Sequence, residues 1–132
     1  MTTPTQIEQA IGERLKATPG IPDIVWQNQD ANPERPFVFM QHVPTARSDV
    51  TGDGGGEQAT GYFTATVVIA ENQYTTPALV IAEAIMAQFP YTLKISAGSG
   101  NVSIYHPPHT ENGFRDGPDW RVPVRIDYQT VA

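Results

Sequence analysis

The side chains best suited to catalysis or metal binding lie in one loop near the C-terminus of the 132-residue chain. His106 and His109 flank two prolines, and Asp116 and Asp119 follow. Histidine titrates near neutral pH, so proton transfer or zinc binding is the first chemistry to consider. Zinc ligands normally come from ordered elements at helical or hairpin spacing, which His-Pro-Pro-His does not provide. The two carboxylates have no apolar surroundings to raise a pKa. We interpret this segment as a loop at the rim of a sheet.

A second candidate is the glycine-rich insert from Pro44 to Thr60. It lacks the lysine that a Walker phosphate loop requires, and its glycines neither follow a strand directly nor open a helix, as a dinucleotide-binding motif does. Asp49, Asp53 and Glu57 stand four residues apart and carry oxygen ligands, but this spacing matches no calcium-binding loop. The insert has too little apolar material to join a core. It is therefore predicted to be a mobile arm that contacts other chains.

Nucleophilic catalysis has no support in the sequence. There is no cysteine, and the glycine-flanked Ser99 lies in a Gly-Ser-Gly-Asn segment typical of a hairpin turn. His42 falls within a predicted strand and is interpreted as a structural residue. We therefore predict a protein that is not an enzyme, with no catalytic residue, no metal site and no cofactor.

Charge and hydropathy argue against two further classes of protein, those that bind nucleic acid and those that span a membrane. Fourteen acidic residues and eight basic ones give a net charge of -6, which argues against binding to a phosphate backbone. Arg115, Arg121 and Arg125 lie close together in the sequence, and the last two share one face of a strand. The most apolar stretch, at 78–87, contains Glu83 and is half as long as a membrane span. No secretory signal is visible, so we expect a soluble protein without a membrane partner.

Two helices are predicted from capping signals and periodicity. Thr3 is placed as the N-cap of the first helix, with Pro4 at its first position and Gln6 completing a capping box. This helix ends before Pro19-Gly20, and its apolar stripe is Ile7, Ala10, Ile11 and Leu15. The second helix begins at Thr76-Pro77 and ends before Pro90. Its apolar stripe is Leu79, Ala82, Ile85, Met86 and Phe89.

Strands are predicted at 24–26, 37–43, 61–70, 91–96, 102–105 and 120–128. The last of them alternates strictly between an apolar face and a polar one. Pro123 cannot donate to a ladder, so this strand is placed at a sheet edge, or its missing donor faces solvent. The predicted fold class is α+β: a mostly antiparallel β-sheet packed against two α-helices, with a long glycine-rich loop between strands, in a single domain over 1–132.

This order of elements resembles the tail terminator family of tailed bacteriophages. The resemblance covers nearly the whole chain, and its most distinctive parts are Ala87-Gln88-Phe89-Pro90 and the Trp-Arg-Val-Pro-Val segment at 120–124. It implies a structural protein that forms a hexameric ring on the end of the tail tube, stops tube polymerisation and offers a docking surface to the head. The implied partners are further copies of the chain, the tail tube protein and a head-completion or connector protein.

The resemblance also implies a location in the virion, at the head–tail junction, after assembly in the host cytoplasm. DNA would pass through the ring without specific binding, and an acidic lumen would repel its backbone. The residues expected to contact another subunit or the tail tube are Arg47, Asp49, Asp53, Glu57, Arg121 and Arg125. Two alternatives stay open: another head–tail connector of the same small ring-forming class, and a ligand-binding domain that uses the loop from His106 to Asp119.

Overall fold

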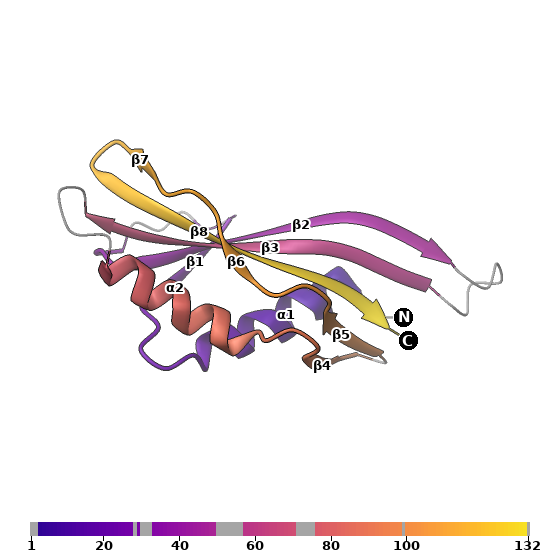
Figure 1. The fold of residues 1–132 in the computed structure, drawn as a ribbon. Coiled ribbons are helices and arrows are strands. Elements are labelled where there is room, and N and C mark those ends of the chain that lie inside the picture. The colour runs from indigo at the N-terminus through magenta and orange to yellow at the C-terminus, as the bar shows by residue number, and fades with distance from the viewer. Residues whose placement is uncertain are drawn as a thin grey trace.

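The computed structural model describes residues 3–27, 29, 33–49, 57–70, 76–98 and 100–131. In chain order, these residues form α1 (Pro4–Lys16), β1 (Asp23–Trp26), β2 (Phe37–Asp49), β3 (Glu57–Ala70), α2 (Thr76–Gln88), β4 (Lys94–Ala97), β5 (Gly100–Ile104), β6 (His109–Thr110), β7 (Phe114–Asp116) and β8 (Asp119–Val131). Both helices lie on the same side of the sheet (Figure 1). Neither is long and apolar enough to cross a membrane.

The first helix begins as its sequence predicts. The Thr3 hydroxyl accepts a hydrogen bond from the Gln6 backbone N–H at 3.2 Å, and the Gln6 side-chain oxygen accepts one from the Thr3 N–H at 2.9 Å. This capping box satisfies two of the donors that a helix start leaves unpaired, and Pro4 at the first position removes a third. The buried residues of α1 are Ile7, Ile11 and Leu15.

The described strands form one sheet in the order β1-β2-β3-β8-β5-β4, with β6 and β7 also paired to β8. The first pair, β1 with β2, is parallel, and the other pairs are antiparallel. The predicted hairpin near residue 98 is present as β4 and β5, with Gly98 in the left-handed region that the turn requires. Ser99 lies outside the described residues.

The predicted α+β class is wrong. Strands account for 50% of the structure, the sheet is mixed and curls into a half-barrel, and the helical share is small. The insert at Pro44 to Thr60, predicted to be a loop, adds to the strand content. Within it, β2 continues to Asp49 and β3 begins at Glu57, and these extensions pair with each other. Polar residues can extend a hairpin beyond the core because the ladder satisfies their backbone groups.

The prediction that the last strand lies at a sheet edge is also wrong. β8 pairs with β3 on one side and with β5, β6 and β7 on the other. The Pro123 carbonyl accepts a hydrogen bond from the Glu111 N–H at 2.9 Å. In an antiparallel strand, the N–H and C=O of one residue point to the same side. The donor that Pro123 lacks would therefore face the segment between β6 and β7, so the long ladder with β3 stays uninterrupted.

The core lies between the sheet and the two helices. The predicted alternation of β8 is confirmed, because Val122, Val124, Ile126 and Tyr128 are buried in this core. From β3 the core receives Phe63, Ala65, Val67 and Ile69. The prediction for α2 needs one correction: Ala78, Ala82, Ile85 and the following Phe89 are buried, whereas Leu79 is exposed. We call the sheet face turned away from both helices the back face; it carries a small cluster of Val25, Phe37 and Val68.

Candidate assembly interface

The β2–β3 hairpin extends beyond the part of the molecule that has a core. We call its outer part, at Pro44–Asp49 and Glu57–Thr60, the arm. Backbone pairing continues out to Asp49 opposite Glu57, and the paired strands reach past both helices (Figure 1). Residues 44–48 are exposed. A long paired hairpin without a core of its own is a surface that another chain can cover.

The arm changes direction at its base. The pairing register shifts between Pro44 and Ala46, which is an irregularity of the β-bulge type, and Gly61 is the partner of Pro44. A Cβ atom on Gly61 would lie 2.7 Å from the Val43 carbonyl oxygen and 2.7 Å from the Tyr128 hydroxyl. Only glycine leaves room for Tyr128 to cover the backbone at this point. The close packing at the base of the arm therefore depends on a residue without a side chain.

A buried histidine joins three elements at the same place. His42, on β2, is 7% exposed, and its ring stacks on Phe63 with 4.4 Å between the ring centroids. Its Nδ1 lies 3.0 Å from the Glu8 carboxylate of α1, and its Nε2 lies 2.6 Å from the Tyr128 hydroxyl of β8. A carboxylate only accepts, so Nδ1 carries a proton; when the ring has no second proton, Nε2 accepts from the tyrosine. His42 thus has the satisfied structural role that its strand position indicated.

The Tyr128 phenol titrates abnormally at this site. Burial, together with the negative charge of Glu8, raises the pKa of Tyr128 to about 12, and Arg47 acts in the opposite direction. In the unfolded chain the phenol ionises near its ordinary value of 10.0. The protonated Tyr128 phenol therefore makes its full contribution to the free energy of unfolding below about pH 10, and this contribution is lost as the pH rises towards 12.

Tyr128→Phe tests this linkage. At neutral pH we expect the variant to lose about 1 kcal/mol of unfolding free energy, because the hydrogen bond to His42 is missing. Above about pH 10 the wild type should lose up to about 1.4 kcal/mol per pH unit more than the variant does. Urea unfolding at a series of pH values measures both curves, with the exposed Tyr91 changed to Phe as the control. Parallel curves for Tyr128→Phe and the wild type would contradict the assignment.

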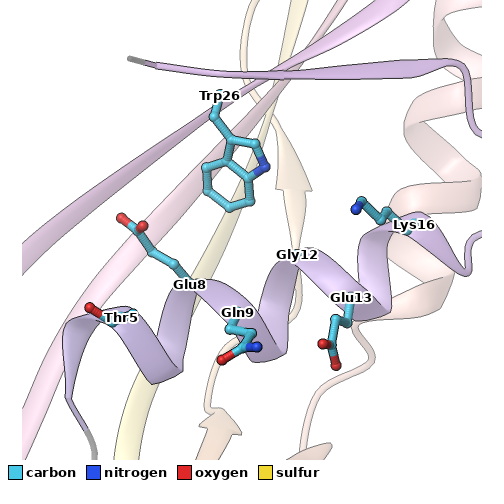
Figure 2. A pocket seen from close by; sticks show the side chains of 7 residues that line it. All are labelled: Thr5, Glu8, Gln9, Gly12, Glu13, Lys16 and Trp26. Carbon is cyan, nitrogen blue, oxygen red and sulfur yellow. The ribbon is translucent and has the colours of Figure 1, made fainter. Parts of the chain in front are cut away.

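An open groove of about 560 Å³ runs along α1 on the side of β1. Figure 2 shows the Trp26 indole turned towards the helix above Gly12, with Thr5 and Lys16 at opposite ends of the groove. A Cβ on Gly12 would lie 2.9 Å from the indole, so glycine allows this close contact. Glu8 is engaged by His42. The lining residues are Thr5, Glu8, Gln9, Gly12, Glu13, Lys16 and Trp26.

Arg121 and Arg125 lie on the back face, where each is held by a carboxylate. Arg125 Nε is 3.1 Å from Asp127 Oδ1, and its guanidinium carbon lies 3.9 Å from the centroid of the Tyr62 ring. Arg121 bridges Asp116 at 3.1 Å and Asp119 at 3.6 Å. Arg35 also pairs with Asp119. The back face therefore carries a row of ion pairs.

Of the remaining predicted contact residues, the three that the structure describes lie on the arm. Arg47 is exposed near its base, whereas Asp49 and Glu57 end the two paired strands. Asp53 lies outside the described residues. The arm and the arginines of β8 are separate, because Arg125 is the partner of Thr64, inward of Gly61 along β3. The structure thus divides the five predicted residues that it describes between two surfaces.

The loop from His106 to Asp119 brings its two aspartates together, because Asp116 is the partner of Asp119 and both bind Arg121. His109 lies opposite Arg125, further along β8. His106 and His109 are exposed, and the His106 ring lies against Tyr105 at 4.4 Å between centroids. Asp116 and Asp119 pair with arginine side chains. Among the residues that the structure describes, no group of three or more metal-ligating side chains converges on one point.

Sequence reasoning missed two surface features. Leu79 and Val80 of α2 and Phe114 of β7 are large apolar side chains on the surface. The sequence did carry a signal for Leu79 and Val80: α2 is apolar around its whole circumference, which is unusual for a helix with one side exposed to solvent. The signal for Phe114 was not, since a single aromatic residue in a loop has no periodicity.

Comparison with known proteins gives a family and a fold. The family model described as phage tail terminator protein matches residues 6–128. No curated protein matches. One solved chain shares 24% identity, with a TM-score of 0.75 over 97% of this chain and 92% of the other. A second, from the virion of a native gene transfer agent particle, shares 12% identity, with a TM-score of 0.64 over 96% of this chain and 95% of the other. At these identities the structural likenesses establish a shared fold.

Proposed function

The chain belongs to the phage tail terminator family, and from this membership we propose that it forms a ring on the end of the tail tube, terminates tube polymerisation and provides the docking surface for the head. The family is structural and not enzymatic. The observation that carries the proposal is the family match, which extends over residues 6–128. The more general conclusion, that the chain is a structural protein of the phage tail, follows directly from family membership.

The arm supports the proposal as a contact between chains. A ring of identical subunits needs two different surfaces on each copy, and a tube end needs a third. The arm is a paired hairpin, so fewer of its backbone torsions are left to be ordered when a partner binds. We assign Arg47, Asp49, Asp53 and Glu57 to contacts of the arm with a neighbouring copy or with the tail tube. Charged residues of both signs there would favour a defined docking position.

The acidic balance of the chain fits passage of DNA through the ring. With a net charge of -6 per copy, an assembled ring would repel the phosphate backbone and leave the DNA free to move. The protein would work in the virion at the head–tail junction, after assembly in the host cytoplasm. Its other partners would be the tail tube protein and a head-completion protein.

Electron microscopy of particles made without this protein tests the proposal. We expect tubes of uncontrolled length and heads without tails, because neither tube growth nor head docking is limited. Adding the purified protein back should restore uniform tails. Tails of normal length with heads attached would refute the function. Tails of normal length without heads would favour the alternative, a connector that joins the head and never caps the tube.

A further inference from the structure

The outward stripe of α2 is apolar although it faces solvent. Leu79 and Val80 are 40% and 58% exposed, and Glu83 is the only charged residue among the 13 of the helix. The opposite side of α2 packs on the core, so the helix has apolar residues on both sides. Such a helix is normally covered on both. The residues of the outward stripe, at helical spacing, are Thr76, Leu79, Val80, Glu83 and Ala87.

A second exposed apolar side chain lies on the opposite side of the subunit. Phe114 is 47% exposed and pairs with Arg121, which in turn pairs with Val68. Residues directly opposite each other in antiparallel strands share a face. Val68 belongs to the cluster of the back face, whereas its neighbour Val67 belongs to the core under the helices. Phe114 therefore lies on the back face.

In three of the four ion pairs that the structure describes on the back face, the arginine side chain is more exposed than the carboxylate that it binds. The side chains of Arg35, Arg121 and Arg125 are 22% to 36% exposed, whereas those of Asp119 and Asp127, with which they pair, are 7% and 11% exposed. The arginines therefore cover these carboxylates. Asp116, at 63%, is the exposed acid of this group. A partner with an isolated carboxylate, such as Glu83, suits this face.

We propose that the outward stripe of α2 in one copy packs on the back face of the next copy. In this contact Leu79 and Val80 cover Phe114, and Glu83 meets the arginines beside it. The two patches differ, as a head-to-tail contact between identical chains requires, and they lie on opposite sides of one molecule. The inference rests on the proposed ring and specifies which surfaces build it.

Mixing two variants tests the pairing. Leu79→Asp disrupts the outward stripe of α2 and leaves the back face intact. Phe114→Asp disrupts the back face and leaves the outward stripe intact. Each variant alone should self-associate at least about tenfold more weakly than the wild type, because a charge replaces a contact at the centre of the interface. An equimolar mixture should form dimers in which the intact stripe of Phe114→Asp packs on the intact back face of Leu79→Asp. These dimers should not grow, because the two surfaces left over are both disrupted. Sedimentation velocity distinguishes monomers, dimers and larger assemblies.

The matched control is Tyr91→Asp, which changes an exposed aromatic residue outside both patches and should assemble like the wild type. Thermal unfolding of all three variants shows that they are folded. The inference is overturned if Phe114→Asp assembles normally, if the mixture yields no dimers, or if the wild type stays monomeric at its highest soluble concentration. If the wild type assembles through this contact but tail length stays uncontrolled, the inference about the interface holds and the proposed capping role is refuted.

Discussion

Gly61→Ala is expected to lower the free energy of unfolding by about 3 kcal/mol. The added methyl group would lie 2.7 Å from the Val43 carbonyl oxygen, which is part of the β2 backbone and cannot turn away. It would also lie 2.7 Å from the Tyr128 hydroxyl, which is held by His42. Either the strands separate or Tyr128 leaves its position, and both disturb the core at the base of the arm. Chemical unfolding followed by circular dichroism measures the loss.

The effect of Gly61→Ala should reach assembly as well. The bend between the core and the arm lies at Gly61 and the opposing Pro44, so displacement there redirects the whole arm. Gln58→Ala, further out on the same strand, serves as the control and should change stability by less than about 0.5 kcal/mol. An unfolding midpoint for Gly61→Ala equal to that of the control would show that the site has room for a side chain.

Shortening the arm should abolish tail capping and leave the fold intact. Ala46 and Thr60 are paired, so replacing residues 47–59 by Asn-Gly closes a two-residue hairpin. The described part of the arm is exposed or half-buried, but the Ala59 N–H donates to the buried Thr130 hydroxyl at 2.8 Å. We therefore expect the unfolding free energy to fall by no more than about 2 kcal/mol, mainly through loss of this hydrogen bond. Complementation of tails that lack the protein should fail, because the shortened chain has lost a contact surface.

A length-matched variant separates loss of the arm from loss of its tip. In it, residues 50–56 are replaced by a Gly-Ser segment of the same length, which preserves the paired strands out to Asp49 and Glu57. Complementation by this variant together with failure of the shortened chain would place the contact on the paired part, where Arg47 lies. Normal, head-bearing tails formed with the shortened chain would show that the arm is dispensable.

Much of the local structure could be predicted because its causes are local. The capping box of Thr3 and Gln6 needs only residues three apart, and the alternation of β8 needs only a period of two. The family resemblance, carried by the order of these elements, is confirmed by the family match over residues 6–128. The assignment of Arg47, Asp49, Asp53 and Glu57 to contacts stays a prediction.

The failures concern partners that are distant in the sequence. Glycine and charged residues between Pro44 and Thr60 indicated a loop, but extended β2 and β3 pair with each other there. Pro123 revealed a missing donor but not the side to which it would point, and that side depends on the neighbouring strands. The predicted stripe puts Leu79 in the core, although Glu83, four residues on and therefore on the same side of the helix, is exposed. Packing against β3 and β8 decided the orientation of α2.

The sequence by itself determined the family, the two helices, the inward face of β8 and the lack of a recognisable catalytic motif, since all of these are written in short-range patterns. Only the tertiary structure decided that the sheet is a mixed half-barrel, that His42 links Glu8 to Tyr128, and that Leu79 and Phe114 lie on opposite sides of the subunit. The physical reason is that strand order and facing depend on burying apolar surface over the whole chain at once. A local pattern specifies which face of an element is apolar, but not which element covers it.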